Sequence, residues 1–194
     1  MHELWVSSGG VRGRQLNWTG HEIGGINLGG AVLVGAELGA ANLAGADLSG
    51  ADLTGAWLAG CVLDDADLNA ANLTKCHLDE CSARMVQASD ANLFRASFYG
   101  ADFQRANLSR SDLTKALLVN ADLRGATLAG CLLDRVGMNG AVFGGTDLAG
   151  ATEISTVVVS RITVDEGPQP RELSGETVLE WFESQARAGT WQDG

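Results

Sequence analysis

The segment with the most reactive side chains is Cys76–Cys81, which reads CHLDEC. Two thiols, an imidazole and two carboxylates lie within these six residues, and such groups can ligate zinc or act as a general base. A zinc site needs four ligands that converge on one point, each at about 2.0–2.3 Å from the metal. The surrounding sequence determines whether these side chains converge, because it sets which of them share a side of the chain.

The sequence around this segment repeats every five residues. From Leu28 to Leu148, steps of five give 25 positions, here called centres, of which 19 are Leu. The position two before each centre holds Ala, Cys, Ser or Thr in 22 of the 25 units, and the residue between is usually polar. Small, polar, large is the alternation of a strand that buries alternate side chains, whereas a helix would distribute a five-residue repeat around its whole circumference. The position two after the centre is Gly in 12 units, which is typical of a tight turn with positive φ.

This repeat places the reactive side chains on opposite sides of the chain. Cys76 and Cys81 occupy the small inward position, whereas His77 and Asp79 occupy outward positions. We therefore predict no metal site, no cofactor site and no catalytic residue in this segment. All four cysteines of the chain occupy the inward position and are predicted to be packing residues: Cys61, Cys76, Cys81 and Cys131.

Units such as ADLSG, ADLTG, ANLAG and ADLRG resemble the A(D/N)LxG units of the pentapeptide-repeat family, over about residues 26–151. The resemblance implies an all-β solenoid, a right-handed quadrilateral β-helix with four units to a coil and with the centre and the small residue pointing inward. Residues twenty apart would then stack at about 4.8 Å, so the 25 units would form a rod about 30 Å long. Residues 82–90, with centres Ala83 and Ala88, are either two degenerate units or a loop outside the coil.

Both ends of the chain depart from the repeat. Residues 1–25 are predicted to form an N-terminal cap of imperfect coils, sealed by Trp5 or Trp18. Residues 152–171 are predicted to form a terminal strand and linker, and residues 172–194 a short amphipathic α-helix with a tail. This helix either caps its own coil or pairs with a second copy to form a homodimer. The apolar side chains predicted for that contact are Val178, Leu179 and Phe182, with Trp181 beside them.

The charge of the chain is uneven along its length. The net charge of −11 disfavours direct binding to nucleic acid or to an anionic membrane. Residues 26–80 carry eight acidic residues and one Lys, whereas residues 81–135 carry five acidic and seven basic residues. The carboxylates proposed as an acidic partner-binding surface are Glu37, Asp47, Asp52, Asp64 and Asp67. A second candidate contact, for a protein partner or for the chain's own tail, is an outward apolar patch of Trp57, Tyr99, Leu117 and Val119.

The sequence also limits the class of the protein. No stretch approaches the roughly 20 apolar residues needed to span a bilayer, and the first residues lack the apolar run of a secretion signal. We therefore expect a cytoplasmic protein with no membrane segment. Because no paired nucleophile and base and no cofactor loop are recognisable, we expect that it is not an enzyme.

One branch of the pentapeptide-repeat family is similar to this sequence in size, acidity and C-terminal helix. Its members are bacterial proteins that bind DNA gyrase or topoisomerase IV as mimics of duplex DNA and protect these enzymes from topoisomerase-targeting antibiotics. The resemblance implies the same activity here, with the acidic residues as the mimic. The centres of that branch are more degenerate and richer in Phe than the Leu-dominated centres of this chain. The alternative is a general protein-interaction scaffold with an unrelated partner, which would use the apolar patch.

Overall fold

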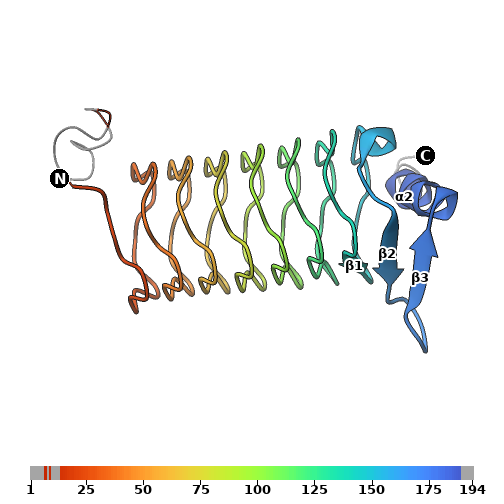
Figure 1. Cartoon of the computed structure of the whole chain (residues 1–194), viewed down its shortest axis with the longest axis horizontal. Coiled ribbons are helices and arrows are strands. Elements are labelled where there is room, and N and C mark those ends of the chain that lie inside the picture. The colour runs from red at the N-terminus through yellow and green to blue at the C-terminus, as the bar shows by residue number, and fades with distance from the viewer. Residues whose placement is uncertain (1–6, 8, 10–13, 189–194) are drawn as a thin grey trace.

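The structure is a computed structural model, and it describes residues 7, 9 and 14–188. It is a β-solenoid whose coils stack into a rod (Figure 1). The first and last described residues lie at opposite ends of this rod. The outward residue in the middle of each unit forms a parallel bridge with the residue twenty further on, from Asn17↔Glu37 to Leu132↔Thr152. A coil therefore contains four five-residue units and has four faces, as the family resemblance implied.

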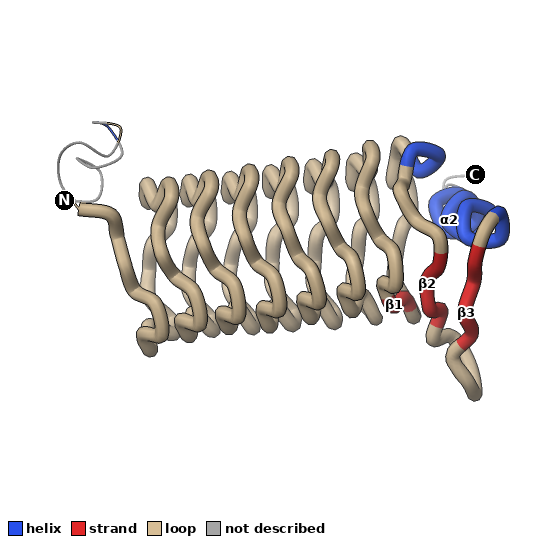
Figure 2. The backbone as a smooth tube through the Cα atoms, in the orientation of Figure 1, coloured by secondary structure: helices blue, strands red, loops and turns tan. Residues whose placement is uncertain are grey.

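Each unit ends in a turn closed by a hydrogen bond across its corner. The amide of Ala51, for example, donates to the carbonyl of Leu48 at 3.0 Å, and Gly50 between them has a φ of +62°. A positive φ at the third turn position is the type II pattern, which glycine adopts without steric cost. Where this corner residue is not Gly, the structure keeps the same conformation, as at Lys75 with a φ of +59°. These short bridges and turns are drawn as loops along nearly the whole rod (Figure 2).

The core is a continuous column of inward side chains. The Leu and Phe centres and their small companions are almost completely buried, from Leu33 to Leu148. Small polar residues enter this core because their own donors are satisfied. The Ser111 hydroxyl donates to the carbonyl of Ala88 at 2.6 Å, and the Thr146 hydroxyl donates to that of Leu123 at 2.7 Å. Each acceptor lies 23 residues earlier, in the preceding coil, so no buried hydroxyl is left without a partner at these two sites.

Residues 82–90 remain within the coil. Ser82 bridges Val62, Gln87 bridges Asp67, and the inward Ala83 and Ala88 are buried. Of the two interpretations, degenerate units are therefore the one that the structure shows. Large rings occupy the core near these small centres. Phe103 lies one coil after Ala83, and its ring packs edge to face with that of Phe98 at a centroid distance of 5.0 Å.

The C-terminal end closes the rod with a small sheet and a helix. Strand β1 (Val142–Phe143) pairs in parallel with β2 (Arg161–Val164), which pairs antiparallel with β3 (Arg171–Ser174). The twenty-residue register changes to 21 here, because Gly137 pairs with Val158 after the 3-10 turn η1 (Ile154–Thr156). Helix α2 (Glu176–Ala188) lies across this end (Figure 1). The helix begins at Glu176, after β3, which is four residues later than the predicted start of this segment at residue 172.

Helix α2 packs on the end of its own solenoid. Val178, Trp181 and Phe182 are buried, and the Phe143 ring lies 5.1 Å from the Trp181 ring and 5.3 Å from the Phe182 ring. Leu179 is 36% exposed and lies outside this contact with the solenoid. At 100° per residue, positions 178, 181 and 182 share a side of the helix, and position 179 is rotated away from it. The end contact supports the capping interpretation of this helix.

The first described coil is less completely buried than the rest. Leu16, Trp18 and Ile23 are partly buried and pack against the core. Asn17 and Glu22 already form the twenty-residue bridges, so coil geometry begins before residue 26. Trp5, the other aromatic residue predicted to seal this end, lies outside the described residues.

Candidate functional site

The CHLDEC segment does not form a reactive centre in the structure. Cys76 is buried and its thiol donates to the carbonyl of Leu53 at 2.7 Å, whereas His77 is exposed and stacks against Trp57 with ring centroids 5.0 Å apart. Burial raises the pKa of the Cys76 thiol to about 12. A hydrogen bond with Cys61, together with burial, raises the pKa of the Cys81 thiol well above its usual value. These thiols stay protonated near neutral pH, which suits packing rather than nucleophilic attack.

The predicted acidic surface is divided among the four faces of the rod. Asp47 and Asp67 bridge one another and lie on one face, and Asp52 lies on the next, where it bridges Val32 and Asn72. Glu37 is on the third face, where it bridges Trp57. Asp64 is on the fourth, where it accepts hydrogen bonds from the Ser82 hydroxyl at 2.6 Å and the Arg84 amide at 2.9 Å. The structure thus brings Asp47, Asp67 and Asp52 together around one edge and separates Glu37 and Asp64 from them.

The three carboxylates at this edge also stabilise their own turns. Asp47 accepts from the amide of Ser49 at 3.0 Å and from its hydroxyl at 2.7 Å, and Asp52 accepts from Thr54 in the same way. The Ser49 hydroxyl and amide lower the pKa of Asp47, so this carboxylate is ionised throughout the neutral range. Asx-type turns of this kind explain why Asp and Asn recur at the outward position. A carboxylate here therefore has a structural role whether or not it also contacts a partner.

The predicted apolar patch lies on one face and is open to solvent. Trp57 and Leu117 belong to one ladder of bridges, with His77 and Ser97 between them. Trp57 is 47% exposed, and Tyr99 and Leu117 are each 49% exposed. Val119 is half-buried. The described part of the tail ends in α2 on Phe143, so it does not cover this patch, and the interpretation that the tail covers it is wrong for residues up to 188.

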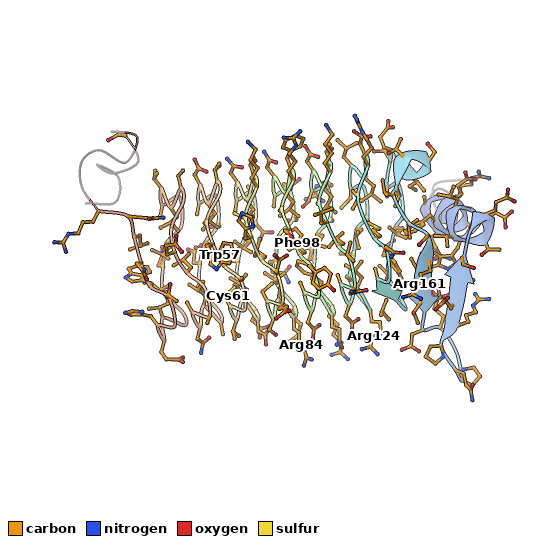
Figure 3. All side chains as sticks on the ribbon, in the orientation of Figure 1. Trp57, Cys61, Arg84, Phe98, Arg124 and Arg161 are labelled. Atoms are coloured by element: carbon orange, nitrogen blue, oxygen red, sulfur yellow. The ribbon has the colours of Figure 1, made fainter. Side chains whose placement is uncertain are left out.

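A network of Asp and Arg residues occupies another face. Arg84 and Arg124 project from the same side of the rod (Figure 3). Arg84 pairs with Asp102 at 2.6 Å, and Arg124 pairs with Asp122 at 2.6 Å and with Asp165, beyond β2, at 3.2 Å. A shallow hollow of about 250 Å³ in this face is lined by Arg84, Met85, Gln104 and Arg105. Arg124 therefore ties the regular coils to the segment that follows β2.

Replacing Arg124 by Met is expected to raise the pKa of Asp122. Burial alone would raise that pKa, but the hydrogen bonds and charge of Arg124 dominate and hold it below its ordinary value of 3.8. The ion pair therefore contributes stability above about pH 4, and this contribution is lost as the pH falls through the lower folded-state pKa. Because the pair is partly exposed, we expect the variant to be less stable by no more than about 1 kcal/mol near neutral pH. Urea unfolding as a function of pH measures this difference, and a difference that does not shrink as the pH falls below the ordinary aspartate pKa of 3.8 would contradict the prediction.

The sequence interpretation missed one column of charges. Four basic side chains occupy the same corner of successive coils: Lys75, Arg95, Lys115 and Arg135. The signal was present, because a step of twenty from Lys75 reaches each of them. Counting charges along residues 81–135 added these side chains to the arginines of other faces, so the column was not recognised. They form the edge next to the apolar patch, since His77 and Leu117 follow Lys75 and Lys115 by two residues.

Comparisons with known proteins agree with this architecture. Among the residues that the structure describes, no helix is long and apolar enough to cross a membrane. No curated protein sequence matches the chain significantly. A trypsin-treated variant of QnrB1, a plasmid-mediated fluoroquinolone resistance protein, matches at a TM-score of 0.56 and 22% identity, over 78% of this chain and 86% of that one.

Two cyanobacterial structures also align, at lower TM-scores. Rfr23 from Cyanothece, a pentapeptide repeat protein, gives 0.43 at 20% identity over 77% of this chain and 87% of its own. HetL from Nostoc, a pentapeptide repeat protein involved in heterocyst differentiation regulation, gives 0.31 at 24% identity over 77% of this chain and 90% of its own.

The sequence matches two family profiles that cover adjoining parts of the solenoid. The profile described as pentapeptide repeat region matches residues 51–128. The profile described as pentapeptide repeats (8 copies) matches residues 24–58 and 116–152. Together they span the coils seen in the structure, and the chain therefore belongs to the pentapeptide-repeat family.

Proposed function

We propose that this chain is a non-enzymatic binding protein that acts on DNA gyrase or topoisomerase IV as a mimic of duplex DNA. In this role it would protect these enzymes from topoisomerase-targeting antibiotics. The observation that carries the proposal is the group of carboxylates around one edge of a narrow rod, with Asp47 and Asp67 stacked on one face and Asp52 on the next. Stacked carboxylates give a rod a negative ridge, and a basic groove that holds DNA would attract such a ridge.

The fold likeness to QnrB1 supports this proposal at the level of architecture. QnrB1 is a fluoroquinolone resistance protein, and its coils align with 78% of this chain. At 22% identity the likeness concerns the fold, so the choice of target depends on the surface charges. The acidic half of the rod, residues 26–80, is the region that we assign to the topoisomerase.

Supercoiling by purified gyrase, measured with and without a fluoroquinolone, tests the proposal. The double variant Asp47→Asn and Asp67→Asn removes two charges and keeps the side-chain oxygen that accepts the turn amide, as Asn27 already does on this face. We expect the protein to restore supercoiling in the presence of the drug, and the double variant to need about tenfold more protein for the same effect.

The matched control is the double variant Asp112→Asn and Asp147→Asn. These residues occupy the same outward position of the repeat and accept the same turn amide, but they lie beyond the acidic half. We expect this control to protect as well as the unchanged protein. Equal loss in both double variants, or no effect of the unchanged protein on gyrase, would contradict the proposal.

A specific observation favours a second candidate function. The patch of Trp57, Tyr99 and Leu117 is about half exposed on one face, and exposed apolar clusters mark protein-binding surfaces. In that case the protein is an interaction scaffold whose partner is unrelated to topoisomerases. If the unchanged protein had no effect on gyrase and a Leu117→Ser variant lost a binding partner that the unchanged protein retains, this function would be favoured over mimicry.

The remaining features of the proposal follow from the family resemblance and the composition. We propose that the coil is right-handed, that the protein acts in the cytoplasm, and that it does not bind nucleic acid directly. A homodimer through α2 would use the outer side of this helix, where Leu179 is exposed, because Val178, Trp181 and Phe182 are already buried against the rod. Deleting residues 172–194 would halve the mass in solution if such a dimer forms.

A further inference from the structure

Four cations form a straight column along one corner of the rod. Lys75, Arg95, Lys115 and Arg135 stand twenty residues apart, each in the left-handed turn conformation with φ between +54° and +59°. The strand residues before them bridge in the same order, through Asn72↔Asn92, Asn92↔Asp112 and Asp112↔Leu132. At about 4.8 Å per coil the column is about 14 Å long.

Lys75, Arg95 and Lys115 form no ion pair within the described residues, although the charge of Lys115 reaches Asp134 and helps to lower the pKa of that carboxyl. Arg84, Arg110 and Arg124, which lie elsewhere on the rod, each donate to an aspartate at 2.6 Å. In the column only Arg135 forms an ion pair among the described residues, with Asp134 at 3.2 Å. Like charges at this spacing repel one another, so an anionic partner would relieve an existing repulsion.

An aromatic ring holds two of these cations in place. The Arg95 guanidinium lies 5.2 Å and the Lys115 ammonium 5.9 Å from the centroid of the half-buried Phe94 ring. A cation–π contact fixes the position of a cation but leaves its N–H donors free. The column therefore presents ordered donors, which reduces the entropy lost when an anion binds.

The apolar patch runs beside this column. Leu117 and Ser97 follow Lys115 and Arg95 by two residues, and Tyr99 lies two residues after Ser97. Leu117 and Tyr99 are each 49% exposed. A line of cations thus runs parallel to the rod axis beside the exposed apolar side chains of Leu117 and Tyr99.

We propose that this edge binds an acidic amphipathic α-helix of a partner protein, laid along the rod axis. A helix rises 1.5 Å per residue, so the axial positions of carboxylates at i, i+4, i+7 and i+11 differ by no more than about 2.1 Å from those of four coils spaced about 4.8 Å apart. Long Lys and Arg side chains absorb such a difference. The neighbouring apolar stripe of the same helix would cover Leu117 and Tyr99.

Other anionic partners fit this edge less well. Carboxylates on one side of an extended strand repeat at about 6.6 Å, which accumulates a mismatch of more than about 5 Å over the column. Nucleic acid could pair with the cations, but it has no aliphatic surface to cover the exposed side chain of Leu117. The inference uses residues of the opposite charge from those assigned to gyrase, so it does not depend on the proposed function.

Fluorescence anisotropy with the full chain and a labelled 18-residue helical peptide tests this inference. The peptide carries Glu at i, i+4, i+7 and i+11 and Leu on the adjacent stripe. The control peptide has the same composition with the Glu residues distributed around the helix. We expect the striped peptide to bind at least about tenfold more tightly than the control, and its affinity to fall as salt is added.

A matched pair of variants locates the binding surface. Arg95→Glu and Arg105→Glu change the net charge equally, and both sites have the same left-handed backbone, with φ of +58° and +60°. Glu80 already adopts this conformation, with a φ of +57°, so neither change requires a new turn. We expect Arg95→Glu to weaken peptide binding by about tenfold and Arg105→Glu to change it by less than about twofold.

Three results would overturn the inference. Equal weakening by both variants would show that only net charge attracts the peptide. Tighter binding of a single-stranded oligonucleotide, lost in Arg95→Glu, would assign the edge to nucleic acid. Self-association that disappears in Arg95→Glu would assign it to a second copy of this chain. Gyrase assays have no part in these measurements, so failure here leaves the proposed function unaffected.

Discussion

Leu108→Asp is expected to prevent folding or to lower the free energy of unfolding by about 4 kcal/mol or more. Leu108 is 1% exposed and lies in the middle of the inward column, among buried side chains that are almost all apolar. A buried ionised group without a partner is among the largest single destabilising effects in proteins. Denaturant unfolding monitored by circular dichroism measures the change.

The adjacent residue supplies a control with the same new charge. Asn107 points outward, and its side-chain oxygen accepts from the amide and the hydroxyl of Ser109. Asp47 occupies the equivalent position and makes the same contacts, so Asn107→Asp is expected to change stability by less than about 0.5 kcal/mol. If Leu108→Asp unfolded at the same denaturant concentration as Asn107→Asp, the inward assignment of the centres would be wrong.

The repeat made the coil predictable because two positions carry the same information in every unit. A large centre and its small companion recur often enough that the degenerate centres Ala83 and Ala88 do not change the frame. The structure keeps both in the core, where the nearby rings of Phe98 and Phe103 pack together. Local exceptions are tolerated because each coil is held by backbone hydrogen bonds to both neighbours, whatever its side chains.

The outer surfaces were harder to predict, because function depends on which face a residue occupies. Glu37 and Asp64 are near Asp47 in sequence, yet the coil carries them to other faces. The column that includes Arg95 and Lys115 is dispersed through the sequence but continuous in space. Grouping residues by a step of twenty, instead of by proximity in sequence, separates Glu37 and Asp64 from Asp47. The same grouping brings Arg95 and Lys115 into one column.

The C-terminal end required information that no repeat contains. The frame stops near Thr152, where η1 adds one residue to the coil and changes the register. Which side of α2 is buried depends on the position of the Phe143 ring, and periodicity does not reveal that position. Periodicity alone therefore placed Leu179 on the buried side of the helix. Tertiary contact also buries Trp181, which the periodicity placed beside that face, although its indole N–H is buried without a hydrogen-bond partner among the described residues.

Phe182→Ala is expected to detach α2 and to loosen the last coil, while the rest of the rod stays intact. The Phe182 ring is fully buried and packs edge to face against Phe143, with centroids 5.3 Å apart, so its loss should cost about 3–5 kcal/mol of local stability. In a solenoid each coil contacts only its neighbours, and a defect at one end therefore spreads poorly. Hydrogen exchange should become faster in residues 141–188 and remain slow between residues 36 and 120.

Leu179→Ala provides the control for this change on the same helix. Leu179 is 36% exposed, so its truncation is expected to cost less than about 0.5 kcal/mol and to leave exchange unchanged. The released end of the Phe182→Ala protein would also uncover β3, the edge strand of the small sheet, and unpaired edges promote association. Light scattering should therefore rise in Phe182→Ala alone. If exchange quickened equally along the whole rod, the coils would unfold as one cooperative unit, and α2 would be required for the whole fold and not only for its last coil.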